Sequence, residues 1–499
     1  CAIYTQLDRA LKRRCWRVLT LSGSISLLEL AITAALSLLG VALAAPDSLL
    51  NSETFHRLLD LFPGLAPLAE DQRILLLWLM VALCIALAVK SVSLAYLTYR
   101  QAQFSQTVGV YFSVRFYNLL LHAPYLWHVR QDMSMLQTRL TWARFSADFL
   151  LAALQALSQM LVACVLICVV LSVTPWAAIL VIVSTGTSTI LTYVLAQRKV
   201  HELNATSMSM EAGANKVAYP SLQGIREVKI YGQEEAFLSQ FSAKRQGFAR
   251  VQSMLPVIYP APSWILDLTG MCMLLIALLV MSRQGLSVAS LSGQLALLAA
   301  VTWRILPTVN SLVSALLQVQ QHMVYTHDAV QFIRNLEKES KTQKAPIQPV
   351  PCPLHEALEL RDVAFRYPDT PKSHADALVH LNVRIPKGHM IGFIGSSGAG
   401  KSTVVGLLTG LLKPTRGRIL VDGTPMTQDQ EASWLRNIGY VPQSPFLLNA
   451  TIAENVAFSE WGKTIDRDRV EKCCHMAAMD FLKDLPEGLD NVIIPRASI

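Results

Sequence analysis

The stretch that decides the fold reads Gly395-Ser396-Ser397-Gly398-Ala399-Gly400-Lys401-Ser402-Thr403. It follows the apolar run 390–394, which we predict to be a buried strand, and it leads into the apolar helical run 404–412. This is the phosphate-binding pattern G-x-x-x-x-G-K-S/T, whose glycines let backbone N–H groups surround phosphate oxygens. The helix N-terminus adds partial positive charge, Lys401 bridges the outer phosphates and the Ser402 hydroxyl ligates Mg²⁺. The stretch therefore predicts a nucleotide site.

The residues around this loop are typical of an α/β domain. Alternating apolar residues predict three of its strands, at 358–360, 363–365 and 381–385. A polar and then proline-rich stretch precedes these strands and reads as a linker. We therefore divide the chain into a first domain at 1–337, a linker at 338–353 and an α/β domain at 354–499.

The first domain has the composition of a membrane protein. Hydrophobic residues make up 52% of the whole chain and charged residues only 16%, whereas soluble proteins carry roughly 25% charge. Six apolar stretches have the length of about 20 residues that crosses a bilayer: 19–45, 73–97, 148–172, 175–197, 257–282 and 288–316. The predicted fold is an all-α six-helix transmembrane domain followed by an α/β P-loop NTPase domain.

The distribution of Lys and Arg gives the orientation. These residues concentrate before residue 19 and in the long loops 99–147 and 198–255, whereas the loop 46–72 has five acidic residues against only Arg57. Because basic loops stay in the cytoplasm, we expect both termini on the cytoplasmic side. Membrane orientation also explains the net charge of +8, so we expect no nucleic acid partner.

Three of the connecting segments carry their own helical patterns. The stretches 109–130 and 220–241 combine helix formers with mixed charge, so we predict helix, bend, helix in each, with tips able to contact a cytoplasmic partner domain. On the outer side, Phe55, Leu58, Leu59 and Phe62 have the spacing of a short amphipathic helix. That helix could cap the bundle or take part in handling substrate.

With these residues in place, the chain resembles the ABC transporter family over nearly its whole length. Tyr367, in Phe365-Arg366-Tyr367, resembles the aromatic residue that stacks on adenine. Gln443, in Tyr440-Val441-Pro442-Gln443, resembles the family's Q-loop glutamine. The resemblance implies ATP and Mg²⁺ as cofactors, with Tyr367 and residues 395–403 binding ATP and Ser402 and Gln443 at the metal. It also implies that Lys401 and Gln443 act in an ATP hydrolase coupled to transport.

The resemblance is incomplete after Gln443. Hydrolysis in this family also needs an L-S-G-G-Q signature loop, an apolar strand ending in Asp-Glu and a switch His, and none of them follows Gln443 in this sequence. The stretches 291–294 and 264–267 imitate the first two, but both lie in membrane segments. We therefore expect a C-terminally truncated chain that stops at Ile499, ahead of the signature motif.

The resemblance further implies a dimer, because family members hold two ATP molecules between two such domains. A homodimeric half-transporter, with a second copy of the chain as partner, is the simplest form. In this mechanism ATP draws the domains together, and the segments 117–128 and 221–232 transmit the closure to the six-helix bundles. The alternative for these segments is that they are ordinary amphipathic helices.

Charged residues inside the spans are candidates for the cargo site, because charge is costly there. Glu29, Lys90, Asp267 and Arg304 qualify. They could line a polar inward cavity that accepts an anionic head group, or they could form pairs between helices or lie on cytosolic helix extensions.

Weaker features concern the transported substrate. The stretches 303–310 and 224–232 and the outer helix look like bacterial flippases for lipid-linked oligosaccharides. That likeness implies a multi-pass protein of the bacterial inner membrane that exports or flips a lipid. Export of drugs or peptides, and a nucleotide-gated or non-transporting product that only binds ATP, are the alternatives.

Overall fold

A computed structural model describes residues 7–44, 72–173, 175–283, 288–341, 350–368, 376–443 and 445–494. The chain forms two compact units, which we call unit 1 and unit 2. Unit 1 consists of Cys1–Ala123, Gln131–Ala218 and Leu238–Thr342. Unit 2 consists of Pro124–Arg130, Tyr219–Phe237 and Gln343–Ile499.

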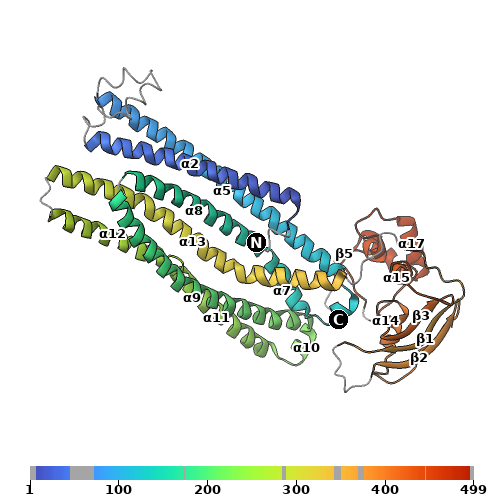
Figure 1. Cartoon of the computed structure of the whole chain (residues 1–499). Coiled ribbons are helices and arrows are strands. Elements are labelled where there is room, and N and C mark those ends of the chain that lie inside the picture. The colour runs from blue at the N-terminus through green and yellow to red at the C-terminus, as the bar shows by residue number, and fades with distance from the viewer. Residues whose placement is uncertain are drawn as a thin grey trace. The chain divides into compact units, whose positions relative to one another are not determined.

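Unit 1 is built from long helices (Figure 1): α2 Arg9–Ala44, α5 Gln72–Leu121, α7 Met133–Ala143, α8 Phe145–Val173, α9 Pro175–Gln223, α11 Glu234–Ile258, α12 Ala261–Ser282 and α13 Val288–Lys341. The part of α9 after residue 218 and the part of α11 before residue 238 belong to unit 2. Helices lie over all six predicted spans. In the described part of the chain, three stretches are long and apolar enough to cross a membrane: Met80–Leu121, Met133–Cys168 and Glu234–Ile276.

The long helices continue well past the predicted spans. Helix α13 has 54 residues, contains Pro307 and runs to Lys341. It therefore includes the first four residues that we assigned to the linker 338–353. The reason is local, because Lys338, Glu339 and Lys341 are good helix formers and the first proline comes only at Pro346.

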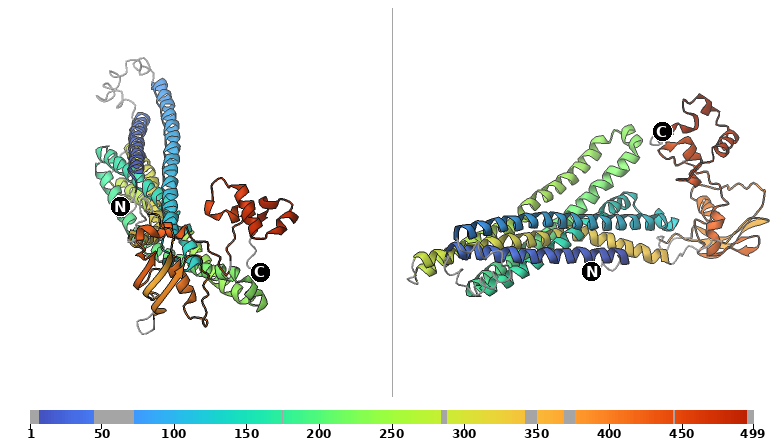
Figure 2. Two further views of the ribbon diagram at one scale, coloured as in Figure 1. Left: turned by 90° about the vertical axis from the view of Figure 1, so that its right-hand side faces the viewer. Right: turned by 90° about the horizontal axis from the view of Figure 1, so that it is seen from above.

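Close approaches at small residues position the helices of unit 1. Helix α8 packs against α13, α5 and α2, and α12 packs against α13 (Figures 1 and 2). A Cβ atom on Gly109 of α5 would lie 2.7 Å from the Cβ of Ala147 in α8, and one on Gly270 of α12 would lie 2.6 Å from Cδ1 of Leu306 in α13. Gly109 lets the backbones of α5 and α8 approach closely, as is common between membrane helices, and Gly270 leaves room for the side chain of Leu306.

Apolar side chains on the outside of unit 1 fit a lipid environment. On α5 the side chains of Leu77, Trp78, Ile85 and Val92 are more than half exposed. Such a contiguous apolar surface is rare on a soluble protein and marks contact with membrane or another chain. These four residues of α5 all lie within the predicted span 73–97.

Both predicted helix, bend, helix segments are confirmed. The first consists of α5, the short α6 at Tyr125–Val129 and α7, and the second of α9, the short α10 at Ile225–Ile230 and α11. Asp132 caps α7 because its carboxylate accepts hydrogen bonds from the backbone N–H of Ser134 (2.9 Å) and Met135. The outer helix predicted around 55–62 lies outside the described residues.

Unit 2 contains an antiparallel sheet with strand order β2-β1-β3-β4 (Figure 1). Its strands are β1 Ala357–Phe365, β2 Leu378–Pro386, β3 Arg416–Val421 and β4 Thr424–Pro425, and a separate pair joins β5 Ala450–Thr451 to β6 Val492–Ile493. The helices are α14 Lys401–Leu408, α15 Gln428–Leu435, α16 Ile452–Val456 and α17 Arg467–Met476, with 3-10 turns at Phe458–Glu460, Asp480–Asp484 and Gly488–Asp490. The three predicted strands at 358–360, 363–365 and 381–385 are confirmed within β1 and β2.

The core of unit 2 lies between the sheet and α14. Val363 of β1 and Leu407 of α14 are fully buried in it. Trp434 of α15 closes one side and donates a hydrogen bond from Nε1 to the carbonyl oxygen of Leu408 at 2.9 Å. Leu126 of α6 packs, half-buried, against the same core. Helix α14 is thereby fixed by its apolar face, while its N-terminus stays accessible.

The predicted buried strand at 390–394 is wrong. The structure assigns no strand there, and the side chains of Met390 and Ile394 are fully exposed. A buried strand needs a hydrogen-bonded neighbour as well as apolar side chains. In the described part of unit 2 the sheet consists of β1 to β4, and none of these strands pairs with 390–394.

Candidate functional site: the phosphate loop of unit 2

The loop 395–403 turns into α14 through glycines in the left-handed region. Gly398 has φ of 82° and Gly400 has φ of 86°, which costs glycine little and strains other residues. Gly400 is also sterically restricted, because a Cβ atom there would lie 2.8 Å from Cδ2 of Leu378 and 3.1 Å from the carbonyl oxygen of Ala377. The conformation of the loop therefore depends on both glycines.

Lys401 crosses the loop that it belongs to. Its Nζ donates hydrogen bonds to the carbonyl oxygens of Gly395 at 2.9 Å and Ser396 at 2.7 Å. The ammonium group thus lies over the mouth of the loop, next to the start of α14. The lysine and the helix dipole place positive charge at one point, which favours an anion.

The donors of the loop fit a polyphosphate. At the start of α14 the backbone N–H groups of Lys401, Ser402 and Thr403 have no acceptor inside the helix, because a helix leaves its first N–H groups unpaired. Residues 395–399 and Ser402 are exposed, so a ligand can reach them. Among the described residues no group of three or more His, Cys, Asp or Glu could hold a metal ion. A single hydroxyl, that of Ser402, suits Mg²⁺ that takes most of its ligands from phosphate and water.

Tyr367 lies beside this loop. Its hydroxyl is 3.2 Å from Oγ1 of Thr403, and its ring contacts the buried Phe365 edge-on, with the centroids 4.9 Å apart. The residue is half-buried against the core of unit 2. The structure therefore brings together two predicted ligand-binding residues, Tyr367 and Thr403, that are 36 positions apart in the sequence.

Gln443 is placed differently. Its side chain is exposed, and no hydrogen bond joins it to the loop 395–403 in the part of the chain that the structure describes. Its role at the metal therefore stays a prediction.

The four charged candidates for the cargo site lie on different helices of unit 1. Asp267 of α12 is exposed and accepts a hydrogen bond of 3.4 Å from Nδ2 of Asn310 in α13. Lys90 is half-buried in α5. Glu29 belongs to α2 and Arg304 to α13, but their side chains lie outside what the structure describes. The contact of Asp267 with Asn310 is a polar link between helices, which was one of the two alternatives.

The stretches 291–294 and 264–267, which imitate catalytic motifs, are helical. The first lies in α13 and the second in α12. Neither has the loop or strand conformation that the imitated motif requires, as predicted.

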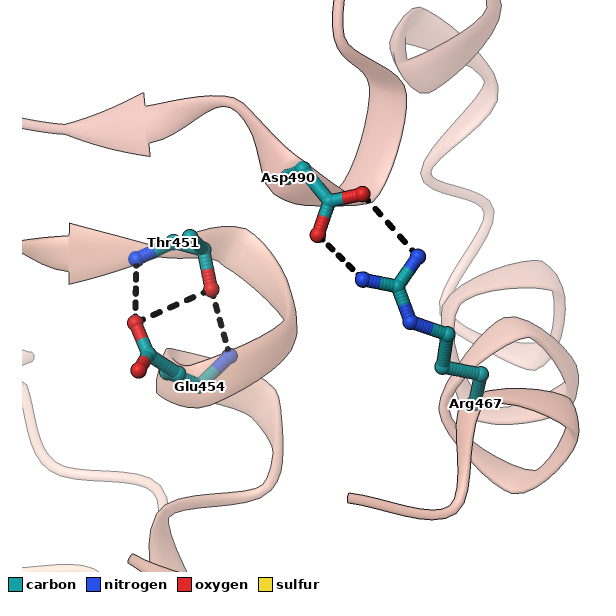
Figure 3. Close-up of polar contacts among 4 residues, drawn as sticks. All are labelled: Thr451, Glu454, Arg467 and Asp490. Atoms are coloured by element: carbon teal, nitrogen blue, oxygen red, sulfur yellow. Dashed lines mark hydrogen bonds and ion pairs between the residues drawn. The ribbon is translucent and has the colours of Figure 1, made fainter. Parts of the chain in front are cut away.

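The segment after the Q-loop is held by two local polar motifs (Figure 3). In the first, Glu454 accepts a hydrogen bond from the backbone N–H of Thr451 at 2.8 Å, and Thr451 Oγ1 accepts one from the N–H of Glu454 at 3.1 Å. This capping box begins α16. In the second, both Nη atoms of Arg467 in α17 contact the carboxylate of Asp490. The two motifs position this segment without contributing to the phosphate loop.

Sequence reasoning missed one residue that bears on coupling. Leu126 lies within the predicted coupling segment 117–128, yet nothing in the sequence singled it out. The only signal that the sequence offers is its apolar side chain. In the structure, the five-residue helix α6 that contains it has no fully buried residue. The second segment, 221–232, contains α10 and the buried Val228. Both short helices belong to unit 2.

Comparison with known proteins agrees with this architecture. The family model of the ABC transporter transmembrane region matches residues 32–305, and that of the ABC transporter matches residues 378–489. A solved bacterial Atm1-family ABC exporter with ATP bound has the same fold, with a TM-score of 0.73 and 20% identity over 98% of this chain and 81% of that one.

Among curated relatives, the ATP-dependent lipid A-core flippase of Cupriavidus metallidurans is 27% identical over 79% of this chain and 66% of its own length. The ABC multidrug transporter mdr2 of Aspergillus fumigatus is 35% identical over 28% of this chain and 17% of its own length. This chain thus spans two thirds or less of the length of both relatives. Because the transmembrane-region model alone matches more than half of the 499 residues, and unit 2 carries the ATP-binding domain, the chain belongs to the ABC transporter family.

Proposed function

We propose that this chain is one half of a dimeric exporter that uses ATP to flip an amphipathic lipid across a bacterial inner membrane. The observation that carries the proposal is the loop 395–403, where Lys401, the start of α14 and Tyr367 converge. This loop occurs in one chain with a bundle of long apolar helices. Several relatives are named lipid A-core flippases, which supports a lipid as cargo.

The residues of the loop suggest how ATP is held. The ammonium of Lys401 exchanges the carbonyl oxygens of Gly395 and Ser396 for phosphate oxygens, and the N–H groups at the start of α14 bind the same phosphates. Ser402 would ligate Mg²⁺, and Gln443 would orient water near the metal. When bound, ATP with Mg²⁺ supplies the phosphoryl transfer that drives the cycle.

Tyr367 stacks on adenine in this proposal. Its contact with Thr403 holds the aromatic ring next to the phosphate loop, so base and phosphates are held on adjoining elements of unit 2. Removing the ring should weaken ATP binding, because stacking on an aromatic face contributes roughly 1–3 kcal/mol per base. Phe in place of Tyr367 would keep the ring and lose only the Thr403 contact.

The short helices α6 and α10 transmit the change to the membrane helices. Both belong to unit 2, although each is joined in sequence to long helices. Leu126 supports this role, because its apolar side chain packs on the core that also holds α14. A second copy of the chain would supply the other half of each ATP site, with both termini in the cytoplasm.

The test is lipid transport by the purified protein in vesicles, with Lys401→Ala against the control Lys463→Ala. Lys463 is exposed and lies outside the loop. We expect Lys401→Ala to lower ATP-dependent flipping of a fluorescent lipid by about 100-fold or more, because charge-stabilising contacts to phosphates are worth several kcal/mol. Lys463→Ala should retain full activity. Unchanged flipping by Lys401→Ala would exclude ATP-driven transport through this loop.

The multidrug transporter among the relatives gives a second candidate cargo. Competition decides between the two: a lipid flippase should be inhibited by excess phosphorylated glycolipid and not by a neutral or cationic drug. The variants Asp267→Asn and Lys90→Gln then show whether these charges act on the cargo. Altered cargo preference with an unchanged ATPase rate is the expected result.

A further inference from the structure

A basic pocket lies between α2 and α5. It has a volume of about 570 Å³ and is lined by Arg14 and Arg17 of α2, Arg100 of α5, and hydroxyl or amide groups that include Ser24, Gln103 and Thr107. The lining contains three arginines and no acidic residue. We refer to it as the α2–α5 pocket.

No carboxylate among the described residues pairs with the arginines of this pocket, Arg14, Arg17 and Arg100. Arg100 donates from Nη1 to Oε1 of Gln103 at 3.2 Å, and its guanidinium lies 5.9 Å from the ring centroid of Tyr96. Guanidinium groups bind phosphate and carboxylate by paired hydrogen bonds, so three of them around one space favour an anion with several oxygens.

Helical spacing brings the lining together. On α2 the lining positions 14, 17, 21 and 24 follow the helical repeat, and on α5 the positions 96, 100, 103 and 107 do the same. Behind the pocket, Nε2 of the buried Gln101 donates to Oγ of Ser158 in α8 at 2.8 Å, and Ser158 donates to Oγ of Ser22 at 3.0 Å. These hydrogen bonds fix both walls, so the pocket is preformed.

The position of the pocket relative to the predicted spans indicates where the anion comes from. Arg14 and Arg17 come immediately before the predicted span 19–45, and Arg100 comes immediately after the span 73–97. The arginines therefore lie at the cytoplasmic membrane surface, where the phosphates of lipid head groups are found. Next to them Trp16 and Tyr96 are more than half exposed, as is usual for aromatic residues at a membrane interface.

We infer that the α2–α5 pocket binds the phosphate of an anionic lipid head group from the cytoplasmic leaflet. The acyl chains would lie along the exposed apolar face of α5, which includes Val92. The binding needs neither ATP nor transport. It therefore stands apart from the proposed flippase function, although a phosphorylated cargo could use the same chemistry.

The experiment measures lipid binding to the full chain in detergent, where no charged bilayer contributes. Phosphatidic acid, phosphatidylcholine with the same acyl chains, and inorganic phosphate are titrated separately and detected by native mass spectrometry. The pocket variant is Arg14→Gln/Arg17→Gln/Arg100→Gln. Its control, Arg9→Gln/Arg13→Gln/Arg198→Gln, removes the same charge from three exposed arginines that do not line the pocket.

We expect the pocket variant to bind phosphatidic acid about tenfold more weakly, and the control variant less than about twofold more weakly. Phosphatidylcholine binding should change little. Equal losses of affinity in the two variants would mean that net charge alone explains the binding. This result would overturn the inference. Inorganic phosphate that binds as tightly as phosphatidic acid would overturn the assignment to lipid.

Two further variants keep the result interpretable. Replacing the three arginines by lysine preserves charge and solubility but removes paired hydrogen bonds, and we expect affinity between those of the wild type and the glutamine variant. Lys401→Ala should bind phosphatidic acid normally. Failure of lipid binding with intact transport, or of transport with intact lipid binding, would then identify which proposal is wrong.

Discussion

Unit 2 contains two apolar regions of similar sequence character and opposite structure. In the sheet, Leu360 and Val363 of β1 are buried, and their strand is hydrogen-bonded on both sides by β2 and β3. In the segment 390–394, an equally apolar run is exposed and belongs to no strand. Burial of a strand therefore depends on its hydrogen-bonding partners as much as on its side chains.

The two regions also differ in their roles: the sheet contributes to stability, and the exposed segment leads into the loop that is proposed to bind the ligand. The sheet and the apolar face of α14 form the core, whereas the phosphate loop begins where the exposed segment ends. Lys401 and Ser402 are held at the edge of a well-packed element and still reach solvent. Substitutions in the two regions should consequently affect different measurements.

The largest expected effect tests the comparison directly. Leu407→Ala removes a fully buried side chain of α14 and should destabilise unit 2 by about 2–5 kcal/mol. Ile394→Ala, in the exposed segment, should stay within about 0.5 kcal/mol of the wild type. Hydrogen exchange of peptides from β1 and α14 in the intact protein measures both. Similar losses from the two variants would mean that 390–394 is buried like the sheet.

A glycine opposite the bulge of β1 sharpens the comparison within the sheet. Gly417 has φ of 81°, and a Cβ atom there would lie 2.2 Å from the carbonyl oxygen of Asp362. Gly417→Ala should cost about 2–4 kcal/mol, because it adds a clash to the strain of a positive φ. Gly423 has a φ of 76°, but a Cβ atom there would have no other atom within 4 Å. Gly423→Ala should therefore destabilise the fold by only about 1 kcal/mol. Thermal unfolding of the two variants separates clash from strain.

The capping box tests a region that has only the two-stranded pair of β5 and β6 and a small core. Thr451→Ala removes the side chain that caps α16 (Figure 3) and should destabilise the segment around it by about 1 kcal/mol. Faster exchange should be confined to peptides near 450–460. Thr464→Ala, an exposed threonine without this role, is the control, and equal effects would contradict the assignment of the cap.

The smallest effect depends on pH. Hydrogen bonds from the backbone N–H groups of Glu356, His355 and Ala357 lower the pKa of Asp422 below its ordinary 3.8. Since the folded pKa is the lower one, the ionised carboxylate stabilises the fold above pH 3.8, and this contribution is lost as the pH falls through the folded pKa.

Asp422→Asn should therefore unfold more easily than the wild type at pH 7, and the difference should shrink as the pH falls below about 4. Denaturant titrations at several pH values measure this. Asp484→Asn, at an exposed position, is the matched control. A constant difference at all pH values would contradict the role of the Asp422 charge.

The sequence predicted local features well because their signals are local. Alternation located β1 and β2, and helical spacing with mixed charge located the bends that contain α6 and α10. Contacts between distant residues could not be predicted in this way. The approach of Tyr367 to Thr403 depends on how β1 packs beside α14, and the α2–α5 pocket depends on which faces of two helices meet. In the sequence, Arg14 and Arg17 indicate only how the chain is oriented in the membrane. Their place in a pocket depends on α5, which brings Arg100 opposite them.

Helix α13 combines unusual length with one weak point. With 54 residues it is about 81 Å long, and Pro307 interrupts its hydrogen bonding near one third of that length. The 34 residues after Pro307, up to Lys341, form an arm of about 51 Å. A bend of only about 10° at the proline would move the far end by about 9 Å. The helix can thus act as a lever that pivots at Pro307, so that a small rotation at the proline becomes a large displacement at Lys341.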